Sequence, residues 1–179
     1  MATTEIICAG FGGQGVLVTG LILANAAMDQ DRNILWYPSY GVEMRGGTAN
    51  CNVKISDDEI ASPFATNLDI LIAMNEAAVT KFESRVKPGG HMFVNSSTVK
   101  SNRAFRSDIH VHKVPASEIA NDVGNSRGAN IVILGALAKQ TDLFEPAYLR
   151  KAIDLFFEKK GKINPQNAVC FDKGVELTA

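Results

Sequence analysis

The sequence has few cysteines, and they are poorly placed for a metal centre. Cys8, Cys51 and Cys170 stand far apart, and no CxxC pair occurs. An iron–sulfur cluster needs four ligands, and zinc sites of the common type use closely spaced cysteines, so we expect neither within this chain alone. We predict reduced, mostly buried thiols, as in a cytosolic protein.

The sequence also lacks an excess of charge and a long apolar run. Its net charge of −1 at pH 7 favours neither nucleic acid nor an anionic membrane as a partner. No apolar stretch approaches the ~20 residues that a membrane-spanning helix needs. The first residues, MATTEIICAGFGGQG, show no basic region followed by an apolar one, so we expect no secretory signal. The predicted location is cytoplasmic.

What is present is the pattern of one α/β domain covering 1–179. Short apolar runs bounded by glycine or proline alternate with stretches long enough for helices, which indicates a Rossmann-like, mainly parallel sheet flanked by helices. The last third of the chain is predicted to be helical. The expected strands are 5–10, 33–38, 48–56, 68–74, 91–95 and 109–115. The expected helices are 15–28, 75–86, a short one for which Ser117 is the candidate cap, 128–141, 145–161 and 164–178.

Two of these strands carry further expectations. In 48–56, alternate residues are apolar, which predicts a half-exposed, antiparallel strand at or near a sheet edge. In 33–38, Pro38 is expected to end the strand, because proline cannot donate to the ladder.

A glycine-rich turn follows the first strand and opens the first helix. Glycines permit a tight turn and close approach of the backbone, and the helix start presents free amides to an anion. Gln14 adds an amide side chain at the rim of the turn. The candidate residues are Gly10, Gly12, Gly13, Gln14 and Gly15.

A nicotinamide-binding protein would also carry an acidic residue at the end of its second strand. Here that strand ends in Tyr37, Pro38 and Ser39, and Asp29 and Asp31 come too early. Three readings of the turn remain open. It could bind a dinucleotide, bind some other phosphate or carboxylate group, or serve only for packing against the sheet and a neighbour.

A second cluster of unusual residues occupies 40–48. Three glycines imply unusual backbone angles or close contact, and a glutamate and an arginine two residues apart point the same way if the chain is extended. A solvated loop with an exposed ion pair is the plain alternative. The candidate residues are Tyr40, Gly41, Glu43, Met44, Arg45, Gly46, Gly47 and Thr48.

Together, GFGGQGV and SYGVEMRGGTANC resemble the gamma subunit of 2-oxoacid:ferredoxin oxidoreductases, and ASPFATNLDILIAMNEAAVTKF continues the likeness, which covers essentially the whole chain. The family's usual second motif reads YGPEMRGG, and Val42 replaces its proline here. The resemblance implies a holoenzyme that decarboxylates a 2-oxoacid, with 2-oxoglutarate favoured. It uses thiamine diphosphate and Mg, passes electrons through iron–sulfur clusters to ferredoxin, and transfers the acyl group to coenzyme A.

The resemblance further implies that this chain is not catalytic alone and carries neither thiamine diphosphate nor an iron–sulfur cluster, and it leaves open whether coenzyme A contacts this chain. Its partners would be the thiamine-binding alpha and beta subunits and a ferredoxin-like subunit, and the isolated chain could form a homodimer through surface that partners normally cover. Two alternatives are a stand-alone Rossmann-type nucleotide-dependent oxidoreductase and the small subunit of indolepyruvate ferredoxin oxidoreductase.

For the site residues, the resemblance places 40–48 against the thiamine-binding subunits. Gly46 and Gly47 would admit a partner's backbone, and Arg45, directed by Glu43, would meet a carboxylate or phosphate. The glycine turn would border the coenzyme A route. No catalytic or metal-binding residue is expected. His110 and His112 share one face of a strand without an evident third ligand, so we interpret them as structural.

Overall fold

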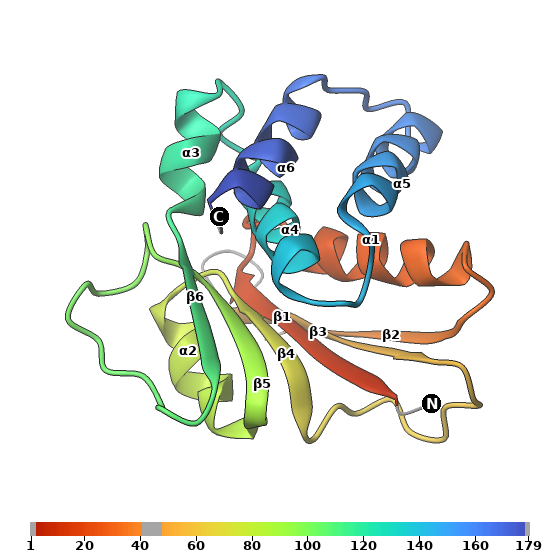
Figure 1. Ribbon diagram of the computed structural model, residues 1–179, viewed down its shortest axis with the longest axis vertical. Coiled ribbons are helices and arrows are strands. Elements are labelled where there is room, and N and C mark those ends of the chain that lie inside the picture. The colour runs from red at the N-terminus through yellow and green to blue at the C-terminus, as the bar shows by residue number, and fades with distance from the viewer. Residues whose placement is uncertain (1–2, 41–47, 178–179) are drawn as a thin grey trace.

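A computed structural model describes residues 3–40 and 48–177 (Figure 1). Six strands form one sheet: β1 Thr4–Phe11, β2 Asn33–Tyr40, β3 Thr48–Ser56, β4 Leu68–Ala73, β5 Val86–Asn95 and β6 His110–Val114. The helices are α1 Val16–Met28, α2 Glu76–Phe82, α3 Ala116–Asp122, α4 Ala129–Gln140, α5 Pro146–Lys159 and α6 Gln166–Glu176, with a 3₁₀ turn at Glu83–Arg85. The predicted helix 75–86 therefore ends early, and the strand after it begins at 86 instead of 91.

The strands lie in the order β2-β3-β1-β4-β5-β6. β1, β4, β5 and β6 are parallel neighbours, whereas β3 is antiparallel to both β1 and β2. β2 consequently points the same way as β1, and β3 is the one described strand that runs against the rest. The predictions of a mainly parallel sheet and of an antiparallel strand at 48–56 are confirmed.

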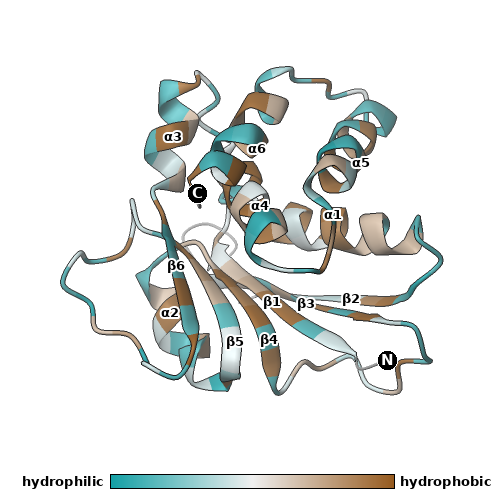
Figure 2. Cartoon of the chain, in the orientation of Figure 1, coloured by the Kyte–Doolittle hydropathy of each residue, from teal (hydrophilic) through white to brown (hydrophobic). Residues whose placement is uncertain are grey.

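Helices cover the two faces of the sheet unequally. α1, α3, α4, α5 and α6 gather on one side, and α2 lies on the other (Figures 1 and 2). Side chains alternate accordingly along β1, where Ile6 and Cys8 belong to the larger core and Ile7 and Ala9 to the smaller one beneath α2. The predicted helical last third is confirmed.

α4 is the central helix of the larger layer, buried along most of its length. It meets α6 backbone to backbone, because a Cβ atom on Gly135 would lie 2.1 Å from the carbonyl oxygen of Phe171. A Cβ on Gly174 would lie 2.0 Å from the carbonyl oxygen of Val132. Only glycine permits this approach, so both positions are fixed by packing.

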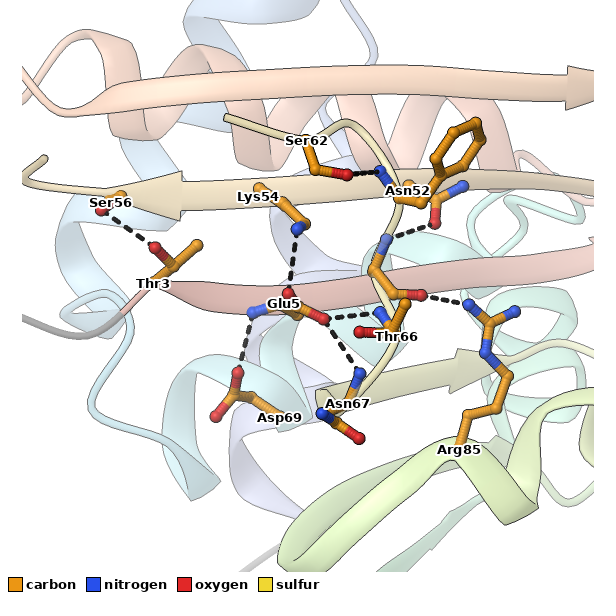
Figure 3. A network of polar contacts seen from close by, with 12 residues as sticks. Thr3, Glu5, Asn52, Lys54, Ser56, Ser62, Thr66, Asn67, Asp69 and Arg85 are labelled. Atoms are coloured by element: carbon orange, nitrogen blue, oxygen red, sulfur yellow. Dashed lines mark hydrogen bonds and ion pairs between the residues drawn. The ribbon is translucent and has the colours of Figure 1, made fainter. Parts of the chain in front are cut away.

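The expectation of a half-exposed β3 is wrong. Its polar side chains Asn50, Asn52, Lys54 and Ser56 are all buried. The segment 57–67 lies over Asn52 and Lys54 on the α2 side (Figure 3).

Hydrogen bonds fasten this segment to the sheet. The backbone amide of Ala65 donates to Asn52 Oδ1 at 3.0 Å, and the amides of Thr66 and Asn67 donate to Glu5 Oε2 at 2.7 and 3.0 Å. Loop amides thus satisfy Asn52 and also Glu5, which in turn pairs with the buried Lys54, as burial demands.

Two local predictions also fail. Pro38 does not end β2, which continues to Tyr40. β2 is an edge strand, where a missing amide donor is tolerated. Ser117 does not cap α3, whose N-cap is Pro115; the Ser117 hydroxyl instead accepts a hydrogen bond from Asn95 Nδ2 at 2.9 Å.

No helix in the described ranges is both long and apolar enough to cross a membrane.

Candidate functional site

The glycine turn lies at the carboxyl end of β1, the edge of an α/β sheet where ligands gather. Gly13 and Gly15 adopt φ angles of 92° and 74°, which disfavour other residues. The amide of Gln14 donates to the Phe11 carbonyl at 3.1 Å and closes the turn. Gly15 is the N-cap of α1 and supplies no side-chain acceptor, so the first amides of that helix are left to other partners.

Gln14 does not stand free at the rim as the sequence suggested. Its Oε1 accepts from the Phe11 amide at 2.7 Å and from Asn75 Nδ2 at 3.0 Å, and its Nε2 donates to the Met74 carbonyl at 3.1 Å. These bonds tie the end of β1 to the end of β4. Asn75 also caps α2 through the Ala78 amide. Gln14 therefore braces the turn.

The other side of the turn packs against the start of α4. Asn130, almost fully buried, donates through Nδ2 to Thr19 Oγ1 at 3.2 Å. A Cβ atom on Gly15 would lie 2.7 Å from that same nitrogen, so the close approach again requires glycine. A cavity of about 350 Å³ opens beside Gly13 and Gly15 and reaches the loops before α4 and α6.

The second motif meets the first through the register of β3. Tyr40 ends β2 and Thr48 begins β3, directly opposite Phe11 at the end of β1. Thr48, the C-terminal end of the segment 40–48, is thereby held beside the glycine turn, and Tyr40 lies one strand further across the sheet, which the spacing in sequence could not reveal. The predicted residues between them, Gly41, Glu43, Met44, Arg45, Gly46 and Gly47, lie outside the described residues.

An exposed aromatic pair was missed by reasoning from sequence. Tyr37 on β2 and Phe64 on the segment 57–67 meet edge to face with ring centroids 5.4 Å apart. They remain 43% and 55% exposed, and Phe11 at the end of β1 is 39% exposed. The signal available was the aromatic residue of SPF in the loop 57–67, but nothing in the sequence placed it on the sheet.

The three cysteines are buried, as predicted. Cys8 lies directly opposite Cys51 in the β1–β3 register. A hydrogen bond with Cys51, together with burial, raises the pKa of Cys8, and burial raises the pKa of Cys170. Cys8 and Cys170 are therefore protonated and poorly reactive near neutral pH, whereas the hydrogen bond with Cys8 lowers the pKa of Cys51.

The histidines form a stacked cluster on β5 and β6. His112 Nε2 lies 3.0 Å from His91 Nδ1, and the His112 ring stacks on Phe93 with centroids 4.5 Å apart. Burial, reinforced by the neighbouring imidazoles, lowers the pKa of His112 to about 4. In the ranges described, no three His, Cys, Asp or Glu side chains are arranged to hold a metal ion. His112 therefore packs as one ring of this stack, and its structural role stays a prediction.

The sheet order also bears on the dinucleotide interpretation. A dinucleotide would extend from the glycine turn to an acidic residue at the end of β2. β3 separates β1 from β2, so that end lies two strand spacings away, about 10 Å across the sheet. The last residues of β2 are Tyr37, Pro38, Ser39 and Tyr40, and none of them is acidic. The arrangement suits an anion at the turn better than a complete dinucleotide.

Comparison with known families gives a match along almost the whole chain. The model for pyruvate ferredoxin/flavodoxin oxidoreductase matches residues 5–177. Ketoisovalerate oxidoreductase subunit VorA of Methanothermobacter thermautotrophicus is 42% identical over 170 residues. These cover 94% of this chain but 35% of VorA, so the chain spans about a third of that relative.

Other relatives match this chain in length. 2-Oxoglutarate synthase subunit KorC of Methanocaldococcus jannaschii is 35% identical over 175 residues, covering 97% of this chain and 92% of KorC. The gamma subunit of a keto/oxoacid ferredoxin oxidoreductase from Geobacter sulfurreducens is 29% identical with a TM-score of 0.79, covering 98% of this chain and 99% of that one.

The fold recurs inside a larger chain. The 2-oxoglutarate:ferredoxin oxidoreductase of Magnetococcus marinus, solved with 2-oxoglutarate, coenzyme A and succinyl-CoA bound, matches with a TM-score of 0.87 at 24% identity. The match covers 99% of this chain and 31% of that one.

Proposed function

The chain belongs to the pyruvate ferredoxin/flavodoxin oxidoreductase family, and from that premise we propose that it is the gamma subunit of a multi-subunit 2-oxoacid:ferredoxin oxidoreductase. The single observation that carries the proposal is the match over residues 5–177, supported by relatives of the same length as this chain. The holoenzyme would convert a 2-oxoacid, coenzyme A and oxidised ferredoxin to acyl-CoA, CO₂ and reduced ferredoxin.

We propose that this chain acts as one gamma-type domain that shapes and gates the shared site without performing the chemistry. Thiamine diphosphate, Mg and the iron–sulfur clusters would be held by the thiamine-binding alpha and beta subunits and a ferredoxin-like subunit. In the described residues, the cysteines are buried and Gln14 is committed to bracing, so neither is presented as a reacting group.

The 2-oxoacid would be chosen by the thiamine-binding subunits. KorC, whose length this chain matches, favours 2-oxoglutarate. The higher identity to VorA favours ketoisovalerate as the second candidate. Measuring turnover with both acids and with pyruvate separates these candidates.

The segment 40–48 is proposed as the docking and gating surface. The register that sets Thr48 opposite Phe11 supports this role, because it anchors the segment beside the glycine turn at the carboxyl edge of the sheet. Arg45, guided by Glu43, would meet a carboxylate or phosphate at the mouth of the shared site. The glycine turn would border the coenzyme A route, consistent with the free amides at the start of α1.

The test is reconstitution. Co-expressed with its partner subunits, the chain should co-purify with them, and the complex should reduce ferredoxin in a 2-oxoacid- and coenzyme A-dependent manner. The isolated chain should show no nicotinamide-dependent turnover. A chain that binds and reduces a pyridine nucleotide alone, and does not assemble, would show instead the stand-alone oxidoreductase.

Arg45→Ala tests the docking segment. Losing a charge-assisted contact should weaken assembly or raise the KM for coenzyme A about tenfold to a hundredfold, since such a contact contributes about 1.5–3 kcal/mol. Arg45→Lys should retain part of the effect. The control is Arg150→Ala, which removes an exposed arginine from α5 that pairs with Asp172. Unchanged assembly and KM in Arg45→Ala would remove this role.

A further inference from the structure

Two of the three cysteines face each other across neighbouring strands. β1 and β3 lie side by side (Figure 1), and their antiparallel register sets Cys8 directly opposite Cys51. Both residues are fully buried and belong to the larger core, so their side chains point to the same face of the sheet. Cys170 lies elsewhere, on α6, where its Sγ accepts from Asn125 Nδ2 at 3.7 Å. The fold therefore brings together one pair of thiols.

The spacing of this pair suits a disulfide. Opposed residues of an antiparallel pair have Cα atoms about 4.5–5.5 Å apart, and disulfides join Cα atoms about 4.4–6.8 Å apart. Their Cβ atoms, at about 4.5–5.5 Å, would need to approach to about 3.5–4.5 Å. The side chains of Cys8 and Cys51 already share a hydrogen bond. A covalent bond between them thus requires only a small local movement.

The surroundings of Cys51 favour its thiolate. Trp36 Nε1 is buried and has no hydrogen-bonding partner among the described residues. It lies 2.9 Å from the point where a Cβ on Gly20 would stand, and Cys51 Sγ lies 2.4 Å from the same point, so the two atoms are neighbours. A neutral thiol is a weak acceptor, whereas a thiolate would accept this N–H. Hydrogen bonds from Cys8 and Trp36 accordingly lower the pKa of Cys51, although burial opposes them.

The route to Cys51 leads through the edge of the sheet. Trp36 belongs to β2, the edge strand, and is only partly buried. One side of an edge strand is unpaired, and local opening is easiest where few contacts hold a segment. Hydrogen peroxide is small enough to enter during such an opening, whereas a bulky disulfide reagent is not. The oxidant that fits this site is therefore a peroxide.

We propose that Cys8 and Cys51 are a modification site, at which a peroxide closes a reversible cross-strand disulfide. The Cys51 thiolate attacks the peroxide, the O–O bond breaks, hydroxide leaves, and Cys51 becomes a sulfenic acid. The Cys8 sulfur then attacks the Cys51 sulfur, so that the S–S bond forms, the S–O bond breaks, and the hydroxyl leaves as water with the Cys8 proton. The two thiols give up two electrons and two protons, and hydrogen peroxide is reduced to two waters. The reaction needs no other subunit, so it is independent of the proposed function.

The disulfide would act on both sequence motifs. Cys8 lies two residues before Gly10, where the glycine turn begins, and Cys51 follows the segment 40–48 by three residues. Gly10 is tightly packed, because a Cβ there would lie 2.7 Å from Gln14 Oε1. Drawing β1 toward β3 therefore shifts the turn against Gln14 and weakens the hydrogen bonds through which Gln14 braces it.

The experiment treats the folded chain with hydrogen peroxide, removes the peroxide with catalase, and alkylates the remaining thiols after denaturation for mass spectrometry. Wild type should lose two of its three alkylatable thiols and the mass of two hydrogen atoms, and should yield a peptide pair that joins Cys8 to Cys51. Dithiothreitol should restore all three thiols. Trp36 is the sole tryptophan, and its fluorescence should fall as the disulfide forms beside it. Three retained thiols, a sulfinic acid at Cys51 without the bond, or a bond to Cys170 would overturn the proposal.

Variants separate the roles of the two thiols. Cys8→Ala should stop at a Cys51 sulfenic acid, which dimedone traps, and Cys51→Ala should leave Cys8 unoxidised. The control is Cys170→Ala, which removes the remote thiol and should form the disulfide as wild type does. Oxidation of Cys8 at the wild-type rate in Cys51→Ala contradicts the assignment of Cys51 as the attacking thiol.

Hydrogen exchange tests the effect on the glycine turn. The amides of 10–15 should exchange faster after peroxide treatment of wild type, and not after the same treatment of Cys8→Ala. Unchanged exchange in a chain that carries the disulfide refutes the link between the bond and the turn. The thiol counts and the exchange rates are measured on this chain alone, so they stand or fall separately from reconstitution with partner subunits.

Discussion

Replacing Glu5 by alanine should cost this protein much of its stability, because one carboxylate joins three separate parts of the chain. Its Oε1 lies 2.9 Å from Lys54 Nζ on β3, and its Oε2 accepts the amides of Thr66 and Asn67 (Figure 3). Lys54 is 7% exposed and has no other ion pair among the described residues. The substitution would leave a buried ammonium and two amides without their acceptor.

The expected loss of stability in Glu5→Ala follows from these lost contacts. Breaking a buried ion pair by removing one partner costs about 3–5 kcal/mol, and the partial exposure of Glu5 places this case near 3 kcal/mol. For a chain of this size, that loss lowers the melting temperature by about 6–12 °C. Removing the orphaned charge as well, in Glu5→Ala with Lys54→Met, should recover part of the loss. Lys173→Ala, which breaks an exposed pair on α6, should change the melting temperature by no more than about 2 °C.

The pH dependence supplies an independent check. Burial raises the pKa of Glu5, but the Lys54 ammonium and the amides of Asn67 and Thr66 outweigh it, so that pKa lies below its ordinary value of 4.5. The stabilisation is therefore present above pH 4.5 and is lost as the pH falls through the lower, folded-state pKa. Wild type and Glu5→Ala should converge in stability at acid pH. A melting temperature for Glu5→Ala within 2 °C of wild type at pH 7, or a double variant less stable than the single one, would refute this account.

Two further outcomes are expected. Gly135→Ala should destabilise the chain by about 2–4 kcal/mol in urea titration, because the added Cβ would lie 2.1 Å from the Phe171 carbonyl oxygen. Gly161→Ala should cost less, because a Cβ there would meet no neighbour within 4 Å, although the φ angle of Gly161 is 65°. The titration of His112 should lower the free energy of unfolding by about 1–2 kcal/mol as the pH falls from 6.5 to 4. The unfolded chain takes up a proton on this imidazole in that range, whereas the half-buried imidazole of the folded chain, with its pKa at about 4, does not. A His112→Phe variant whose stability falls equally over that range contradicts this.

Features set by local residue patterns could be predicted from the sequence. The glycine turn, α1 and the central strand at 68–74 all lie where expected, because each is fixed by neighbouring residues. The end of 75–86 was less certain, since an amphipathic pattern does not mark the change to a 3₁₀ turn at Glu83.

What escaped prediction depends on contacts between distant segments. Alternation in 48–56 correctly indicated a strand but wrongly implied that Asn52 and Lys54 were exposed, because the loop that buries them follows in the chain and carries no helical or strand pattern. Likewise, Gln14 stood out as a glutamine in a bare loop, but only the sheet brings Asn75 and Met74 within hydrogen-bonding reach. The cavity beside the glycine turn is lined by both the turn and Arg127, more than a hundred positions later, and no local pattern joins them.

The place of β1 in the sheet has a consequence for how the protein emerges from the ribosome. Its partner on one side is residues 48–55, and its partner on the other is residues 70–73. β1 is therefore flanked by segments that leave the exit tunnel several seconds after it, at a translation rate of about 5–20 residues per second. Until then the two edges of β1 are unpaired, so we expect a chaperone to bind nascent β1. We also expect the pairing of β1 with β4 to be a late, slow step of folding.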